Sequence, residues 1–231
     1  MLPMKQISVM LVEDHAVVRQ GLCAILSNDS RFKIAGQAQN GREAVKLVRI
    51  QQPDVVLMDI GMANLNGLEA TRQIIADNRA AKVLILSAHT GRENVERLIA
   101  AGVAGYIDKE SSAEILTQAI YEVAQGRKFF SAAIARHLPD NPNMPRGRDG
   151  LMKSNPAGLT RREAEVLQLV AEGATNKQVG VELSISIKTV EKHRQGLMDK
   201  LKIHDTAGLT RYAIAAGVIE GQSLWTEKAN R

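Results

Sequence analysis

Residues 55–59 have the sequence VVLMD, in which four consecutive apolar residues are followed directly by an aspartate. An apolar run without alternation is typical of a strand covered on both faces, as in a parallel sheet flanked by helices. Runs of similar character occur elsewhere in the first half of the chain. They span residues 7–12, 83–86 and, more weakly, 103–107, and residues 33–38 are a candidate fifth strand.

Helical patterns separate these apolar runs. Val18, Leu22 and Leu26 recur at the spacing of one helix face. Ser111 and Glu114 have the spacing of a capping box in front of another helical stretch. Strand and helix therefore alternate five times, which predicts an α/β domain with a (βα)5 doubly wound parallel sheet.

Polar side chains follow the ends of the predicted strands. Glu13 and Asp14 follow the first strand, Asp59 follows the third, Ser87 ends the fourth and Lys109 follows the fifth. Because open α/β sheets bind ligands at the carboxyl ends of their strands, we expect these side chains to lie together. Several carboxylates suit Mg2+, and a lysine and a hydroxyl beside them can stabilise a phosphoryl group. The pattern predicts that Asp59 is a covalent phosphate acceptor.

These residues and Tyr106 resemble the receiver domain of bacterial response regulators, over roughly residues 5–125. The resemblance implies that Asp59 takes phosphate from a sensor histidine kinase and that Ser87 and Lys109 bind the phosphoryl oxygens. It also implies that Tyr106 turns inward on activation. The expected Mg2+ ligands are Glu13, Asp14, Asp59 and the backbone carbonyl of Ile60 or Gly61.

Several positions depart from the receiver pattern. Ala63 and Glu110 stand where many receivers have proline. Asp108 replaces a residue that is commonly apolar, so it either lies at the surface or weakens the field of the neighbouring lysine at the phosphate. For His15, which follows the acidic pair, a role in the loop is favoured over metal binding because Mg2+ prefers oxygen.

A change of composition divides the chain. Four of the six prolines fall within residues 139–156, and residues 138–158 are rich in Gly, Asn and Asp, which favours a linker. The alternative is a large surface loop inside one domain. The predicted parts are a receiver at 1–127, a linker at 128–157, a helical domain at 158–221 and a tail at 222–231.

The second half has the pattern of a small all-α domain. Capping boxes begin at Thr160 and Thr175, and Gly173 is placed to end the first helix. A third helix is expected over residues 187–201 and a fourth over about 206–216. A short helix, a tight turn and a longer helix predict a four-helix domain with a helix-turn-helix motif.

The third helix of this domain has two different faces. Its predicted inward residues are Ile187, Val190, Leu197 and Leu201. Its predicted outward residues are Lys188, Lys192, Gln195, Asp199 and Lys202. Such an outer face can reach phosphates and base edges in a major groove of DNA. From periodicity alone, the solvated face of a helical bundle remains the alternative.

Residues 159–201, LTRREAEVLQLVAEGATNKQVGVELSISIKTVEKHRQGLMDKL, closely resemble the LuxR-type helix-turn-helix. With the receiver, the whole chain resembles a NarL/FixJ-type response regulator. The resemblance implies that the third helix reads DNA, with Lys192 and Gln195 reading bases, and that the last helix forms a homodimer contact. The expected DNA contacts are Lys188, Thr189, Lys192, Arg194 and Gln195, with Thr175 and Asn176 at a helix start, and Thr189 and Arg194 are assigned to phosphates.

Composition narrows the function classes. The single cysteine, Cys23, excludes an internal disulfide, and no apolar run approaches the ~18–20 residues that span a bilayer. A net charge of +5 permits nucleic acid binding without requiring it. We therefore expect a cytoplasmic protein that does not bind membranes.

The expected function is that of a two-component transcription factor whose phosphorylation promotes dimerisation and promoter binding, with RNA polymerase as a further partner. It is expected to catalyse only its own phosphorylation and dephosphorylation, and so not to act as an enzyme on other substrates. A phosphorylation-independent regulator, with the receiver as a dimerisation module, is the main alternative. A dehalogenase-type phosphatase is disfavoured because it needs an aspartate where this chain has Gly61.

Overall fold

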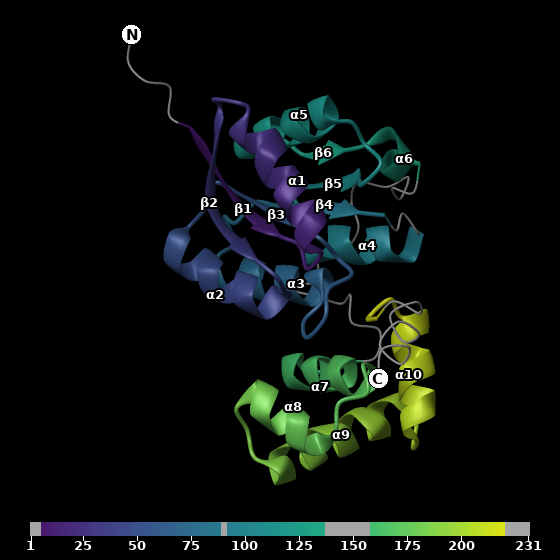
Figure 1. Cartoon of the computed structure of the whole chain (residues 1–231). Helices are drawn as coiled ribbons and strands as arrows, with labels where there is room; N and C mark the ends of the chain where they lie inside the picture. Colours follow the sequence, from purple (N-terminus) through teal and green to yellow (C-terminus); the bar gives the residue numbers. More distant parts are fainter. Residues whose placement is uncertain (1–5, 89–91, 137–157, 220–231) are drawn as a thin grey trace. The chain divides into compact units, whose positions relative to one another are not determined.

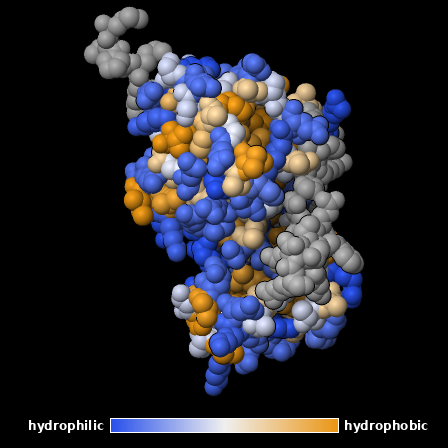
Figure 2. Space-filling view, viewed as in Figure 1, coloured by the Kyte–Doolittle hydropathy of each residue, from blue (hydrophilic) through white to orange (hydrophobic). Residues whose placement is uncertain are grey.

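The computed structural model describes residues 6–88, 92–136 and 158–219 (Figure 1). The described residues form two compact units, one with a parallel sheet and its helices and one with the last four helices. None of the described helices combines the length and apolar character that crossing a lipid bilayer requires. Hydrophobic side chains on the visible surface of the first unit lie among hydrophilic ones (Figure 2).

The first unit alternates strands and helices, as the apolar runs predict. Its strands are β1 (Ile7–Val12), β2 (Phe32–Ala38), β3 (Val55–Met58), β4 (Val83–Ser87), β5 (Gly105–Asp108) and β6 (Phe129–Phe130). Its helices are α1 (Ala16–Ser27), α2 (Gly41–Gln51), α3 (Gly67–Asp77), α4 (Arg92–Ala101), α5 (Ala113–Ala124) and α6 (Ala132–Ala135). The sheet order is β2-β1-β3-β4-β5-β6, and every neighbouring pair is parallel.

Helices cover both faces of this sheet (Figure 1). α1 and α5 lie on one face, where Leu26 and Ile120 pack against strand residues such as Leu11 and Leu57. α2, α3 and α4 lie on the other face. Burial on both sides explains why the four residues of β3 are all apolar and all buried.

The sheet unit extends further than the composition predicts. Phe129 and Phe130, in the segment 128–157 that we assigned to the linker, pair with Gly105 and Tyr106 of β5, and α6 follows them. The predicted boundary at 127 is therefore too early, since a two-residue strand carries no periodic signal. The rest of the predicted linker, from 137, and the tail at 222–231 lie outside the described residues.

The predicted capping box at Ser111 is wrong by one residue. The N-cap of α5 is Ser112, whose side chain accepts a hydrogen bond from the backbone N–H of Ile115. The backbone N–H of Ser111 instead donates to the carbonyl of Asp108 at 3.0 Å, which holds Ser111 in the turn after β5.

The second unit contains α7 (Arg161–Ala171), α8 (Asn176–Leu183), α9 (Ile187–Leu201) and α10 (Thr206–Ala215). Both predicted capping boxes are present, between Thr160 and Glu163 and between Thr175 and Gln178. Gly173 follows α7 with a φ of +94°, a conformation that favours glycine. The helix-turn-helix is therefore α8, a short turn and α9, as the sequence predicts.

Apolar residues from the four helices of this unit form one core. Of the residues predicted to face inward from α9, Val190 and Leu197 are fully buried and Leu201 is half-buried. The prediction for Ile187 is wrong, since 47% of this residue is exposed. It is the first residue of α9, and its side chain lies beyond the end of the core.

Glu163 connects the first and third helices of the second unit. Its Oε2 accepts hydrogen bonds from Lys200 Nζ of α9 and from the backbone N–H of Thr160, both at 2.6 Å. Burial raises the pKa of Glu163, but the bonds from Lys200 and Thr160 outweigh burial and the net shift is downward. Ionised Glu163 therefore stabilises the folded unit at neutral pH.

Gly67, the first residue of α3, packs directly on the end of β3. A Cβ atom at this position would lie 2.0 Å from the carbonyl oxygen of Asp59 and 2.9 Å from Cα of Ile60. The backbone N–H of Gly67 donates to the carbonyl of Ile60 at 2.9 Å. The absence of a side chain at Gly67 therefore fixes the path of the chain through Asp59.

Replacing Lys200 with methionine keeps the aliphatic stem and removes the ion pair. We expect Lys200→Met to destabilise the helical unit by about 0.5–1 kcal/mol, the range of a partly exposed ion pair. The loss should be complete above pH about 4.3, where glutamate is ionised in the unfolded chain, and should shrink as pH falls through the lowered folded pKa of Glu163. Amide hydrogen exchange in α7 and α9 measures it. Lys192→Met, on the exposed side of α9, is the control, and a pH-independent loss contradicts the assignment.

A methyl group at Gly67 forces the chain through Asp59 to move. We expect Gly67→Ala to destabilise the sheet unit by about 1–3 kcal/mol, as overpacking of a closed site does. Gly21→Ala is the matched control, because Gly21 is at an exposed position of α1 where a Cβ atom would meet nothing within 4 Å. That variant should be stabilised by about 0.5–1 kcal/mol through helix propensity. Thermal unfolding measures both, and equal shifts in the two variants disprove the close approach.

Candidate functional site

Two buried carboxylates and a lysine meet at the carboxyl ends of the strands. Nζ of Lys109, just after β5, lies 2.8 Å from Oε2 of Glu13 and 3.1 Å from Oδ2 of Asp59. Glu13 follows β1 and Asp59 follows β3, and both are at least 95% buried. Because β1 and β3 are neighbours at the point where the strand order reverses, the fold brings these residues together as predicted.

The charges of this group shift one another's proton affinities. Burial raises the pKa of Asp59, the charge of Glu13 raises it further, and Lys109 opposes both. Burial lowers the pKa of Lys109, but its hydrogen bond to Glu13 and the charge of Asp59 outweigh burial, so the pKa is raised. Lys109 is therefore a cation that offsets part of the negative charge of two buried carboxyl groups.

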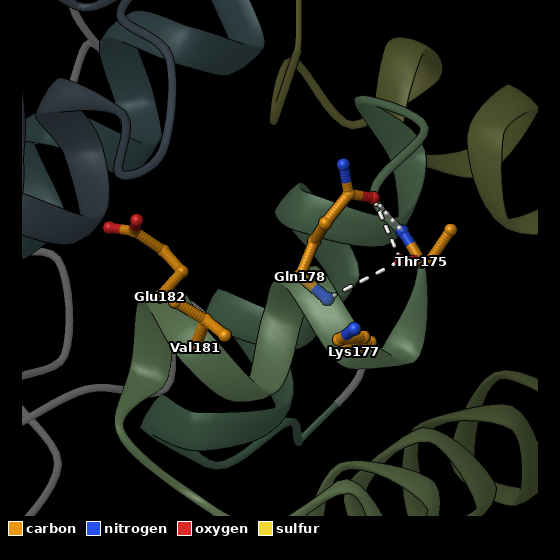
Figure 3. A pocket seen from close by; sticks show the side chains of 5 residues that line it. All are labelled: Thr175, Lys177, Gln178, Val181 and Glu182. Carbon is orange, nitrogen blue, oxygen red and sulfur yellow. Dashed lines mark hydrogen bonds between the residues drawn. The ribbon is translucent and has the colours of Figure 1, made fainter.

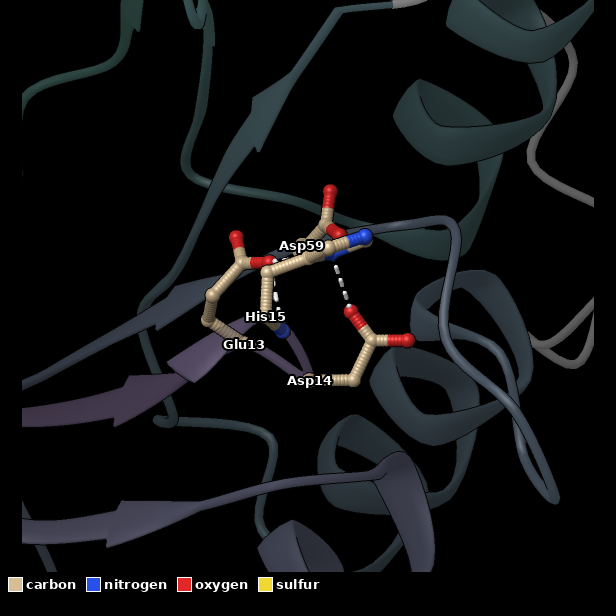
Figure 4. A group of neighbouring side chains, drawn as sticks. All are labelled: Glu13, Asp14, His15 and Asp59. Atoms are coloured by element: carbon tan, nitrogen blue, oxygen red, sulfur yellow. Dashed lines mark hydrogen bonds and ion pairs between the residues drawn. The ribbon is translucent and has the colours of Figure 1, made fainter. Parts of the chain in front are cut away.

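Asp14 and His15 complete the acidic cluster (Figure 4). One ligand atom from each of Glu13, Asp14, His15 and Asp59 lies within 4.8 Å of the others. Nδ1 of His15 is 2.8 Å from Oδ1 of Asp14 and 3.1 Å from Oε1 of Glu13. The charge of Asp14 is the main cause of a raised pKa for His15. Gly61, the remaining predicted ligand, lies two residues beyond Asp59 in the loop between β3 and α3.

Two features of the cluster were not expected from the sequence. His15 lies in the loop before α1 as expected, and its ring also contacts two of the carboxylates. Arg19 lies outside the predicted site, and its Nη1 donates to the carbonyl of Glu13 at 2.7 Å and to that of Asp14 at 3.3 Å. Its position four residues after His15, within the first turn of α1, is a signal that would have found it.

Ser87 and Tyr106 form a buried pair beside the cluster. Ser87 is 2% exposed and Tyr106 is fully buried, and their side chains are hydrogen bonded. Burial raises the pKa of Tyr106 to about 12, so its hydroxyl is protonated at neutral pH. Asp108 is half-exposed, and its Oδ1 accepts a hydrogen bond from the backbone N–H of Glu110 at 2.9 Å in the turn after β5. Of the two alternatives for this residue, the contact favours a position near the surface.

The predicted DNA contacts on α9 divide into two sets. Lys188, Lys192 and Gln195 are exposed, and Gln195 donates to Oδ1 of Asp199 at 2.8 Å. Thr189 and Arg194 are half-buried. The hydroxyl of Thr189 lies 2.8 Å from that of Ser186. Only the first set is exposed on the outer face of the helix.

Arg194 makes its contacts within the helical unit. Its Nη1 donates to Oδ1 of Asn176 at 3.2 Å, and its Nη2 donates to the hydroxyl of Thr206. Thr175, before Asn176, is exposed, but its hydroxyl is bonded to Gln178 in the capping box (Figure 3). An open pocket along α8 is lined by Thr175, Lys177, Gln178, Val181 and Glu182 (Figure 3).

Comparisons with known proteins agree with both halves of this description. Residues 9–121 match the response regulator receiver domain, and residues 157–213 match the luxR family of bacterial regulatory proteins. The transcriptional regulatory protein DegU of Brevibacillus brevis is 34% identical over 87% of this chain and 89% of its own. The response regulator UvrY of Escherichia coli (strain K12) is 33% identical over 94% of this chain and 98% of its own.

Solved structures show the same fold. A LuxR-family two-component response regulator from Aurantimonas sp. SI85-9A1 has a TM-score of 0.56 and 34% identity, covering 58% of this chain and 95% of its own. A complex of the response regulator RcsB with DNA has a TM-score of 0.55 at 19% identity, covering 92% of this chain and 99% of its own. The chain therefore belongs to the two-component response regulators that join a receiver domain to a LuxR-type helix-turn-helix DNA-binding domain.

Proposed function

We propose that Asp59 accepts phosphate from a sensor histidine kinase and that this phosphorylation promotes dimerisation and promoter binding. The observation that carries the proposal is the contact of Lys109 Nζ with both Glu13 and Asp59. A carboxylate nucleophile needs a cation beside it to stabilise the charge on the transferring phosphoryl group. Lys109 is such a cation at 3.1 Å from Oδ2 of Asp59.

The acidic cluster fits a magnesium ion. Glu13, Asp14 and Asp59 offer carboxylate oxygens, the ligands that Mg2+ prefers, and the ligand atoms of the cluster are close enough to share one ion. A bound ion supplies charge neutralisation for the phosphoryl oxygens. The carbonyl of Gly61 is a further ligand implied by the family resemblance.

The residues of the chain perform the transfer. An oxygen of Asp59 attacks the phosphorus of a phosphohistidine, the new O–P bond forms, and the N–P bond breaks with its electron pair returning to the histidine. Lys109 and the hydroxyl of Ser87 then bind phosphoryl oxygens. Because Ser87 is hydrogen bonded to Tyr106, a new partner for Ser87 changes the environment of Tyr106 and so of β5. We further propose that the chain catalyses only its own phosphorylation and dephosphorylation.

In this proposal, phosphorylation of the receiver acts on DNA binding by the helical unit. Lys188, Lys192 and Gln195 form an exposed stripe along α9 that can enter a major groove. We further propose that α10 forms a homodimer contact, that the chain works in the cytoplasm, and that RNA polymerase is a later partner at the promoter.

One observation favours a second candidate function. Tyr106 is buried and bonded to Ser87, and the resemblance associates an inward tyrosine with activation. A receiver that keeps this arrangement through its own packing would act as a dimerisation module without phosphorylation. The dimer state before and after phosphorylation separates the two candidates.

Asp59→Asn should abolish phosphorylation. We expect a mass spectrum of the wild type, after incubation with acetyl phosphate and Mg2+, to show one phosphoryl adduct that is absent from the variant and absent without Mg2+. Asp77→Asn is the control, because Asp77 lies at the end of α3 opposite to the one that packs on Asp59 and pairs with Arg49, so this variant should keep the adduct. Light scattering should show dimer only in the phosphorylated samples. A dimer in every sample, with no adduct, favours the second candidate.

Lys188→Ala should weaken DNA binding through lost charge. We expect lower affinity for any duplex, with the slope of log K against log salt reduced in magnitude by about one, since each phosphate contact releases counterions. Fluorescence anisotropy with a labelled random-sequence duplex measures it. Lys46→Ala, at an exposed position of α2 in the sheet unit, is the control. An unchanged slope in Lys188→Ala indicates that this face of α9 is only solvated.

A further inference from the structure

We propose that Arg194 is a positioning residue that fixes the recognition helix α9 against the starts of α8 and α10, and that it is not a phosphate contact. Its guanidinium donates to side chains on two other helices, Asn176 and Thr206. Asn176 is the first residue of α8, and Thr206 is the first residue of α10. One side chain therefore joins three helices at a single point.

The packing of the helices gives this link its importance. α9 packs mainly against α7 and α8, and α10 packs mainly against α7. Direct backbone proximity between α9 and α10 is therefore limited, and Arg194 supplies a side-chain connection between them. The angle between the helix that reads DNA and the helix proposed to form the dimer depends in part on this connection.

Electrostatics alone does not hold Arg194 in this place. The N-terminus of a helix carries a partial positive charge, so a guanidinium beside the starts of α8 and α10 is unfavourable as a charge. The two directional hydrogen bonds offset this repulsion. The rigid, planar fork of arginine can reach two acceptors at once, which the single ammonium of lysine does not do in the same geometry.

The exposed lysines of α9 show the contrast. Lys188 and Lys192 make no hydrogen bond or ion pair within the described residues, whereas Arg194 is half-buried and has two partners. A cation that binds phosphate changes the salt dependence of DNA binding, while one that only orients the helix changes the affinity at every salt concentration alike.

The test uses the full chain and rests on the proposed DNA binding. Arg194→Met removes the donors, Arg194→Lys keeps the charge but loses the fork, and Thr206→Val removes one acceptor while leaving the arginine in place. The N-cap of α10 is Asp205, so Thr206→Val does not remove the cap. Anisotropy titrations of a labelled random-sequence duplex are made at several salt concentrations, well below the unfolding transition. Circular dichroism checks the fold at that temperature and then follows thermal unfolding of each variant.

We expect all three variants to lose about threefold to tenfold in affinity, the effect of one or two hydrogen bonds, with the salt slope unchanged and the fold intact. The double variant Arg194→Met with Thr206→Val should lose no more than Arg194→Met alone. A slope reduced by about one in Arg194→Met, as in Lys188→Ala, with Thr206→Val neutral, makes Arg194 a phosphate contact and overturns the proposal.

Three other results also count against it. Lower thermal stability with undiminished affinity means that Arg194 only stabilises the fold. Failure of the wild type to bind the duplex overturns both this inference and the proposed DNA binding. Wild-type binding with normal behaviour of the Arg194 variants overturns the inference alone.

Discussion

The first unit is organised around one buried charge arrangement, the ammonium of Lys109 beside the carboxylates of Glu13 and Asp59. Two carboxylates removed from water repel each other, and losing the cation between them leaves uncompensated buried charge, which is costly. Lys109 follows β5, whereas the carboxylates follow β1 and β3, and β4 lies between. Its long side chain therefore reaches across β4, which is possible only if the parallel strands end at the same edge of the sheet.

The pair of Ser87 and Tyr106 extends this arrangement into the core. A fully buried phenol needs a hydrogen-bond partner, and the hydroxyl of Ser87 is that partner. Because a serine hydroxyl has one donor and can also accept, Ser87 can accept from Tyr106 and donate to a phosphoryl oxygen. In the proposed mechanism, a change at Asp59 therefore alters the contacts of β5 through the side chains of Ser87 and Tyr106, without any large movement of the sheet.

Much of this could be predicted from the sequence because the decisive signals are local. Consecutive apolar residues mark the buried strands, and the residue after each strand must lie at the shared edge, so Glu13, Asp59 and Lys109 could be grouped without a structure. Features that depend on packing between distant residues could not be predicted from such local signals. The two residues of β6 are too short for a pattern, and the choice between Ser111 and Ser112 as N-cap depends on a turn bond to Asp108.

In α9 the family resemblance and the residue spacing indicate different roles for Arg194. The resemblance implies a phosphate contact, whereas Arg194 lies four residues after Val190 and three before Leu197, both fully buried. Residues at these intervals share a helix face, so its side chain starts from the edge of the core. Lys188, Lys192 and Gln195 follow the same intervals on the opposite face. The helix therefore separates its polar residues by face, with one exposed stripe and one arginine directed back to the neighbouring helices.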